Sequence, residues 1–240
     1  FHDCTGLESI EIPDTVETID YSAFNGATGL KSVILHEGLK TINNNAFNGC
    51  TELETLKIPD SVTLVDDQAF YACTKLASVK LSNDLITMGT RAFGNCTALT
   101  EITIPAGLTS ASSPFKDCSN LKTIHFEEGI TKIVGGLFSE CTGITEISIP
   151  DTVEIIDESA FSGAANLVSV SIPDSVTEIQ DSAFQNCTKL TSIDIPDSVT
   201  LIDYQAFYGC TKLASVKLSN NLKTLGSRAF GNCTALTEIT

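Results

Sequence analysis

The sequence predicts an α/β solenoid, a right-handed stack of about ten coils of 23 residues joined by one parallel β-sheet. Phenylalanine recurs with this period, and the same apolar rows recur within each period. A turn-forming residue usually follows a short alternating apolar pattern. Because a unit of 23 residues cannot enclose a core, neighbouring units must stack. We therefore expect a single solenoid domain over residues 1–240.

Phenylalanine marks the start of each coil. Nine of the ten intervals between the markers are 23 residues long, and the interval from Phe93 to Phe115 is 22. Residues 110–115, Ser-Ala-Ser-Ser-Pro-Phe, replace the usual polar run there, so we expect a locally irregular coil. Stacked rings at coil spacing predict a core spine. The markers are Phe1, Phe24, Phe47, Phe70, Phe93, Phe115, Phe138, Phe161, Phe184, Phe207 and Phe230.

Positions counted from each marker predict three local structures. Apolar residues at nine and eleven, such as Val79 and Leu81, flank one polar residue, the pattern of a strand with one buried face. The later Val-Thr-x-Ile run, with Val176 and Ile179 at fifteen and eighteen, predicts a second extended segment because β-branched residues favour strands. The Ala-Phe-x-x-Cys-Thr-x-Leu run predicts a helical turn, which supplies the α part of the predicted class.

The motif Cys-Thr-x-Leu-x-Ser-Ile-x-Ile-Pro-Asp-Ser-Val-Thr-x-Ile-x-x-x-Ala-Phe, read from residues 187 to 207, resembles the leucine-rich repeats of the BspA-like class. The resemblance covers the whole chain and repeats ten times. It implies a right-handed leucine-rich-repeat solenoid curved into a horseshoe or arc. It also implies a secreted or cell-surface protein that adheres to host proteins or to other cells.

The chain departs from the commonest leucine-rich repeats at the turn after the strand. Those repeats carry an asparagine ladder, whereas position fourteen here is Thr, Ser, Gly, Asn or Asp. An aspartate row at thirteen is the expected substitute, each carboxylate accepting from backbone N–H groups two residues onward. The row contains Asp14, Asp60, Asp151, Asp174 and Asp197.

An internal duplication bears on function. Residues 59–103 and 196–240 differ at only seven of 45 positions, so surface residues were copied together with core residues. A chain that lengthens by copying coils favours a multivalent surface over a unique catalytic pocket. We therefore expect a non-catalytic interaction or adhesion module without a cofactor. The alternatives are a structural spacer and, less favoured because the acids follow the repeat instead of converging, a glycan-processing enzyme.

Charge narrows the class of partner. Thirty acidic residues against 14 basic ones give a net charge of −16, which disfavours nucleic acid and anionic membranes. No apolar run is long enough to insert into a membrane. Expected partners are host extracellular-matrix proteins, plasma proteins or other cell-surface proteins. Both termini cut through coils, so we expect a longer protein with its signal and anchor elsewhere, and weak end-to-end self-association through uncapped strands.

Cysteine and histidine give little support to chemistry. All nine cysteines occupy position three of a coil, where Ala27 and Ala164 fill the same place, so this position favours a small buried side chain. Free buried thiols are expected, with a few bridges between adjacent coils as the alternative. The three histidines lie far apart in sequence, and no metal-ligand spacing or catalytic motif occurs. The numerous carboxylates are interpreted as a solvated acidic edge.

The outward residues of the first strand, at positions eight and ten, form the candidate binding surface. Position ten varies most from coil to coil. Tyrosines near the markers form an alternative surface, because tyrosine is frequent at interaction hot spots. The first set is Lys57, Lys80, Glu101, His125, Glu146, Asp194 and Lys217; the alternative set is Tyr21, Tyr71, Tyr204 and Tyr208.

Overall fold

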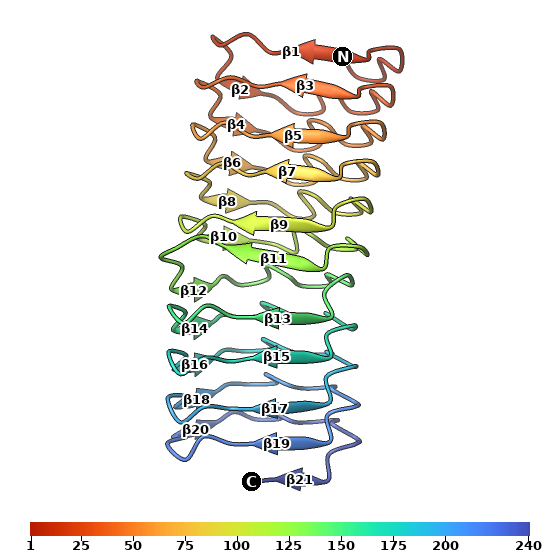
Figure 1. Ribbon diagram of the computed structural model, residues 1–240. Helices are drawn as coiled ribbons and strands as arrows, with labels where there is room; N and C mark the ends of the chain where they lie inside the picture. Colours follow the sequence, from red (N-terminus) through yellow and green to blue (C-terminus); the bar gives the residue numbers. More distant parts are fainter. The chain divides into compact units, whose positions relative to one another are not determined.

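The computed structural model describes residues 1–240 as 21 short strands without a helix (Figure 1). The chain divides into two units, residues 1–127 and 128–240, which we describe separately. Unit 1 contains β1 (Ser9–Glu11), β2 (Thr18–Ile19), β3 (Ser32–Ile34), β4 (Thr41–Ile42), β5 (Thr55–Lys57), β6 (Leu64–Val65), β7 (Ser78–Lys80), β8 (Thr87–Met88), β9 (Glu101–Ile104), β10 (Ser110–Ala111) and β11 (Thr123–Phe126). Unit 2 contains β12 (Lys132–Ile133), β13 (Glu146–Ser148), β14 (Ile155–Ile156), β15 (Ser169–Ser171), β16 (Glu178–Ile179), β17 (Ser192–Asp194), β18 (Leu201–Ile202), β19 (Ser215–Lys217), β20 (Thr224–Leu225) and β21 (Glu238–Ile239). That residues 1–240 form one domain stays a prediction.

The odd-numbered strands are the predicted first strands of the coils. In β5 the central Leu56 is 3% exposed, whereas Thr55 and Lys57 on either side of it are exposed. Paired odd strands run parallel, and β5 joins β7 with Leu56 opposite Val79. The alternating pattern at positions eight to eleven therefore predicted both the strand and its buried face.

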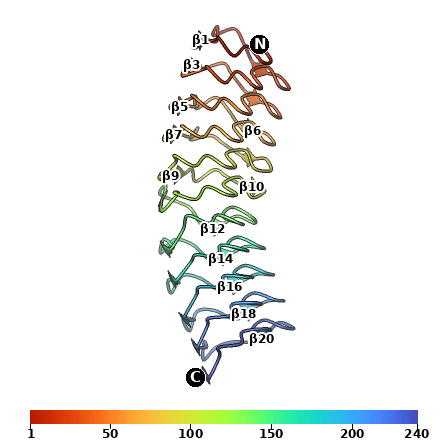
Figure 2. The ribbon, with the colours of Figure 1, turned by 90° about the vertical axis from the view of Figure 1, so that its right-hand side faces the viewer.

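The even-numbered strands form a second row, on the opposite side of the coils within each unit (Figure 2). They build one five-stranded parallel sheet in unit 1, from β2 to β10, and another in unit 2, from β12 to β20. Ile42 and Val65, at the end of β4 and β6, are fully buried. The second extended segment is thus confirmed, but the prediction of one parallel sheet is wrong. Both extended segments of a coil expose backbone groups that the next coil can pair, so each forms its own parallel row.

The predicted helical turn is wrong, and with it the α part of the fold class. The backbone N–H of Phe47 donates to the carbonyl of Ala69 in the next coil at 2.7 Å. The backbone N–H of Cys50 donates within its own coil, to the carbonyl of Phe47 at 3.2 Å. Left-handed residues flank the marker, with φ of 58° at Asn45 and 73° at Gly49. An α-helix is about 10–12 Å wide, which is twice the spacing between coils. A chain of tight turns fits that spacing and bonds alternate N–H groups to the neighbouring coil, which makes the fold a β-solenoid.

The phenylalanine rings form the predicted spine inside each unit. From Phe24 to Phe47 the ring centroids are 4.9 Å apart and the planes differ by 4°. This equals the usual separation of about 4.8 Å between paired strands. The horseshoe or arc that the resemblance implies stays a prediction. The segment 110–115 is irregular as predicted, because the rings of Phe93 and Phe115 separate to 5.9 Å and tilt by 18°.

Candidate functional site

The candidate binding surface is what we call the odd-strand face, the outward side chains of the odd-numbered strands. All seven predicted residues are exposed on it. Unit 1 carries Lys57 on β5, Lys80 on β7, Glu101 on β9 and His125 on β11. Unit 2 carries Glu146 on β13, Asp194 on β17 and Lys217 on β19.

Strand register brings these residues together in pairs and not in one cluster. Lys57 lies opposite Lys80, and Asp194 lies opposite Lys217. On the next strand pair of unit 1, Nε2 of His125 lies 3.9 Å from Oε2 of Glu101. Glu146 lies opposite Ser169, apart from the other candidates. The face therefore presents separate charged positions on a regular backbone frame.

The Asp194–Lys217 pair shows how charge is balanced across coils. Nζ of Lys217 donates to Oδ1 of Asp194 at 3.0 Å. The hydrogen bond and charge of Asp194 raise the pKa of Lys217 above its usual value. Because both side chains are more than half exposed, such a pair adds little to stability. Its effect is to cancel the local charge of the odd-strand face in unit 2.

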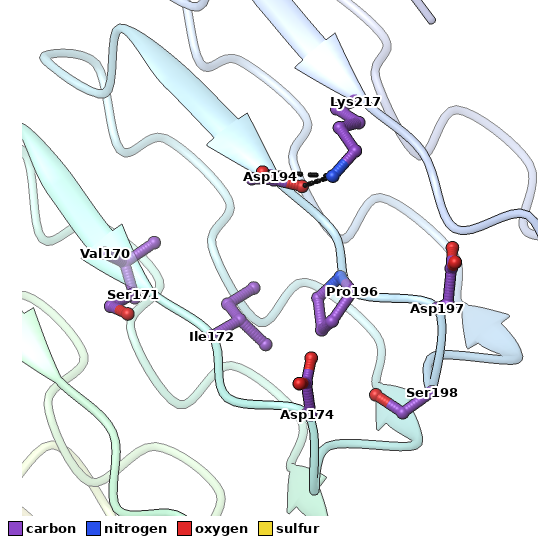
Figure 3. Close-up of a pocket in the computed structure, with 9 residues that line it drawn as sticks. All are labelled: Val170, Ser171, Ile172, Asp174, Asp194, Pro196, Asp197, Ser198 and Lys217. Carbon is purple, nitrogen blue, oxygen red and sulfur yellow. Dashed lines mark hydrogen bonds and ion pairs between the residues drawn. The ribbon is translucent and has the colours of Figure 1, made fainter.

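A hollow of about 630 Å³ opens beside this pair in unit 2 (Figure 3). Its wall contains Asp174, Asp194 and Asp197 together with Lys217. Three carboxylates against one ammonium group make it negative, so it suits a cationic group better than an anion. No set of three or more His, Cys, Asp or Glu side chains in the protein is arranged to hold a metal ion.

Ser198, on the wall of the hollow, departs from the pattern of its row. The equivalent Ser61 and Ser175 donate their hydroxyls to the carbonyls of Leu39 and Val153, each at 2.7 Å. Oγ of Ser198 is buried and has no hydrogen-bond partner. Position fourteen therefore mainly ties a turn to the coil before it, a role that sequence reasoning did not assign.

Two aspartates of the row at thirteen, Asp60 and Asp197, act differently from the prediction. Oδ1 of Asp197 accepts from the backbone N–H of Asn220 at 2.8 Å, and Oδ1 of Asp60 accepts from Asn83 at 3.0 Å. These partners lie one coil away and not two residues onward. The bonds from Asn220 lower the pKa of Asp197 below its ordinary value. Backbone N–H groups of the turn are therefore bonded by a carboxylate of the preceding coil, a partner that only the three-dimensional register reveals.

A comparison with protein families decides the class of the chain. The model of the family described as "BspA type Leucine rich repeat region" matches residues 1–122, 111–167 and 135–240. The chain belongs to this family. The resemblance stated from the repeat motif is therefore confirmed.

Solved structures similar to this BspA-type chain include a bacterial leucine-rich repeat protein and a pneumococcal vaccine antigen. A leucine-rich repeat protein from Bacteroides ovatus is 31% identical with a TM-score of 0.78, and the match covers 97% of this chain and 63% of that one. The pneumococcal vaccine antigen PcpA is 24% identical with a TM-score of 0.56, over 97% of this chain and 67% of that one. The second likeness concerns the fold alone. No curated protein matches.

The cysteine row of the BspA-type coil is structural. None of the nine cysteines forms a disulfide bond, and all except Cys4 are buried. Sγ of Cys50 lies 3.3 Å from the carbonyl oxygen of Phe24, and the bond repeats along both units, as at Cys187 and Phe161. Burial raises the pKa of Cys50 to about 12 and that of Cys187 well above its usual value. Thiols held protonated are poor nucleophiles and poor metal ligands.

The four tyrosines of the alternative surface do not gather in one place. Tyr21 and Tyr204 are 67% and 41% exposed, and they belong to different units. Tyr71 and Tyr208 are half-buried, and each ring lies over a glycine of the next coil, Gly94 and Gly231 respectively. These last two tyrosines fill space between coils. A binding role for the exposed pair stays a prediction.

No helix in the structure has the length and apolar character needed to cross a membrane.

Proposed function

We propose that this BspA-type chain is a non-catalytic protein-interaction module that uses its odd-strand face for adhesion. The proposed partners are extracellular-matrix, plasma or other cell-surface proteins. The proposed location is outside the cell, secreted or on the cell surface. The net charge of −16 supports a protein partner over nucleic acid, since a polyanion would be repelled.

The observation that carries this proposal is that the outward side chains of the odd strands vary in chemistry while the strands repeat regularly. The inward residues of the odd strands are apolar throughout, whereas the outward residues at position ten include Ile34, Lys57, His125 and Asp194. Ile34 is 52% exposed, which removes a core explanation for its apolar side chain. A strand face with separate apolar, basic and acidic positions suits a protein surface better than a small molecule.

The proposal is tested by saturable binding to an array of extracellular-matrix and plasma proteins. A triple variant, Lys57→Glu, Lys80→Glu and Lys217→Glu, reverses three charges on the odd-strand face. A control variant, Lys40→Glu, Lys189→Glu and Lys223→Glu, makes the same change in net charge at exposed lysines outside the odd strands. We expect binding that the first variant loses and the control keeps.

Two other outcomes reject the proposal in different ways. Equal loss in both triple variants means that overall charge, and not the odd-strand face, governs binding. The absence of saturable binding to every protein in the array supports the spacer, because a spacer has no partner to saturate.

A further inference from the structure

Lys57 and Lys80 form an unusual pair on the odd-strand face of unit 1. They lie at matched positions of β5 and β7, whose backbones are about 4.8 Å apart as in other paired strands. Both are exposed, and neither has a carboxylate within the 4.0 Å of an ion pair. Two positive charges directly opposite each other on a sheet repel and destabilise it.

Other lysines of the protein show how the repeat can neutralise a lysine with a carboxylate of the neighbouring coil. Lys31 pairs with Glu8 at 3.1 Å, and Lys75 pairs with Glu52 at 2.7 Å. In both cases the carboxylate lies 23 residues earlier, one coil away. In a chain with 30 acidic and 14 basic residues, an acid before Lys80 would continue this arrangement. Lys57 stands there instead.

The internal duplication supplies a natural comparison. Lys80 and Lys217 occupy the same place in the two copies, which run from 59 to 103 and from 196 to 240. The preceding coil differs, because Asp194 in unit 2 corresponds to Lys57 in unit 1. The same lysine is therefore neutralised in unit 2 and left with a second positive charge in unit 1.

The surroundings of the pair point to the kind of group that it takes. Ile34, one coil before Lys57 in the same row, is 52% exposed. Thr55 and Ser78 add exposed hydroxyls on the same two strands. Two ammonium groups beside hydroxyl donors and an apolar side chain match carboxylates that lie next to an apolar residue.

Building on the proposed function, we propose that Lys57 and Lys80 bind an acidic segment of a partner protein, with an apolar residue of that segment on Ile34. In an extended segment, alternate side chains on one face are about 6.6 Å apart, a spacing that the flexible stems of two stacked lysines can match. A sulfated polysaccharide fits less well, because it has no apolar side chain to contact the exposed Ile34.

The test measures binding of a fluorescent peptide, Gly-Leu-Thr-Glu-Thr-Glu-Thr-Gly, to the whole chain by anisotropy at low salt. We expect Lys57→Gln and Lys80→Gln each to weaken binding by about two- to fivefold, as for exposed charge pairs. Lys57→Asp recreates the balanced pair of unit 2 and should weaken binding by about tenfold or more. Lys40→Gln, at an exposed lysine of unit 1 outside the odd strands, is the matched control and should leave binding unchanged.

A gain-of-function variant makes the test independent of loss through misfolding. Asp194→Lys places a second lysine opposite Lys217 and should add a second, weaker site for the same peptide, seen as a rise in stoichiometry in calorimetry. Equal binding of a peptide with Gln in place of Glu, or stronger binding of a sulfated polysaccharide that depends on the same lysines, overturns the inference.

The failure of this inference can be told apart from the failure of the proposed function. A partner from the protein array that binds saturably and is unaffected by Lys57→Gln and Lys80→Gln overturns the acidic-segment site while the interaction function stands. No saturable partner on the array, with no binding of the acidic peptide, overturns both.

Discussion

At the scale of single residues, the stacking partner decides what each side chain does. The ring of Phe161 is fully buried and lies between the rings of Phe138 and Phe184, at 5.5 Å and 5.1 Å. A cysteine in one coil bonds a carbonyl in the previous coil, and an aspartate bonds an N–H in the next. Each interaction is modest, and the repeat multiplies it along the unit.

Removing one ring from the spine should open a cavity that its neighbours cannot close. We expect Phe161→Ala to lower the free energy of unfolding by about 3–5 kcal/mol, measured by denaturant unfolding. Val168→Ala, at a side chain that is 42% exposed, is the control and should change it little. An unfolding midpoint within error of the unmutated chain would contradict the buried spine.

Acid should weaken the contact of Asp197 with Asn220. The folded-state pKa of Asp197 lies below its ordinary value of 3.8, so the carboxylate stabilises the fold fully above that pH. The contribution is lost as the pH falls through the lowered pKa, when the acceptor is protonated. Melting temperatures measured from neutral pH down to strongly acidic pH should show a shallower acid loss for Asp197→Asn than for the unmutated chain. Parallel curves for the two proteins would refute this role.

At the scale of elements, close stacking fixes which residues fit between coils. The ring of Tyr71 occupies the space beside Gly94, and the duplication repeats this arrangement at Tyr208 and Gly231. A methyl group on Gly94 would lie 3.0 Å from the Tyr71 ring and 2.8 Å from Cβ of Arg91. The short distance between coils, which also rules out a helix in each, thus gives the glycine its place.

We expect Gly94→Ala to destabilise unit 1 by about 1–3 kcal/mol through overpacking, measured by thermal and denaturant unfolding. The double variant with Tyr71→Ala should lose less stability than the two single changes combined, because the ring no longer obstructs the methyl. Gly107→Ala is the matched control, since its nearest neighbour atom would be 3.6 Å away. Equal losses for Gly94→Ala and Gly107→Ala would reject the steric explanation.

At the scale of the whole molecule, buried thiols follow from the repeat itself. Eight of the nine cysteines are buried at the same position of their coils, and Cys4 is exposed. Desolvation raises the pKa of Cys118 and Cys210 to about 12. A row of such thiols resists reagents as long as the coils stay stacked.

Brief treatment of the folded chain with a maleimide should therefore label mainly Cys4, counted by mass spectrometry. Unfolding in guanidinium should make all nine cysteines reactive. Labelling of Cys50 or Cys187 at the rate of Cys4 would show that the coils open readily and would contradict stable stacking.

The sequence alone determined the period, the buried rows, both extended segments and the outward positions of the candidate surface. All of these features depend on the alternation of apolar and polar side chains, which recurs in about ten similar coils. Lys57 and Lys80 were predicted to be exposed for this reason. Their direct pairing depends on which strands bond to each other, and the spacing in the sequence does not decide that.

Only the tertiary structure decided between a helical turn and the chain of left-handed turns around each phenylalanine, and between one sheet and two rows of strands. The physical reason is the spacing between coils. Two rows of paired strands hold the coils about 5 Å apart on both sides, so a helix in each coil does not fit, and alternate N–H groups gain a partner in the next coil. The spacing likewise decided that Asp197 bonds Asn220 across coils, since contacts between neighbouring coils compete with, and here replace, contacts along the chain.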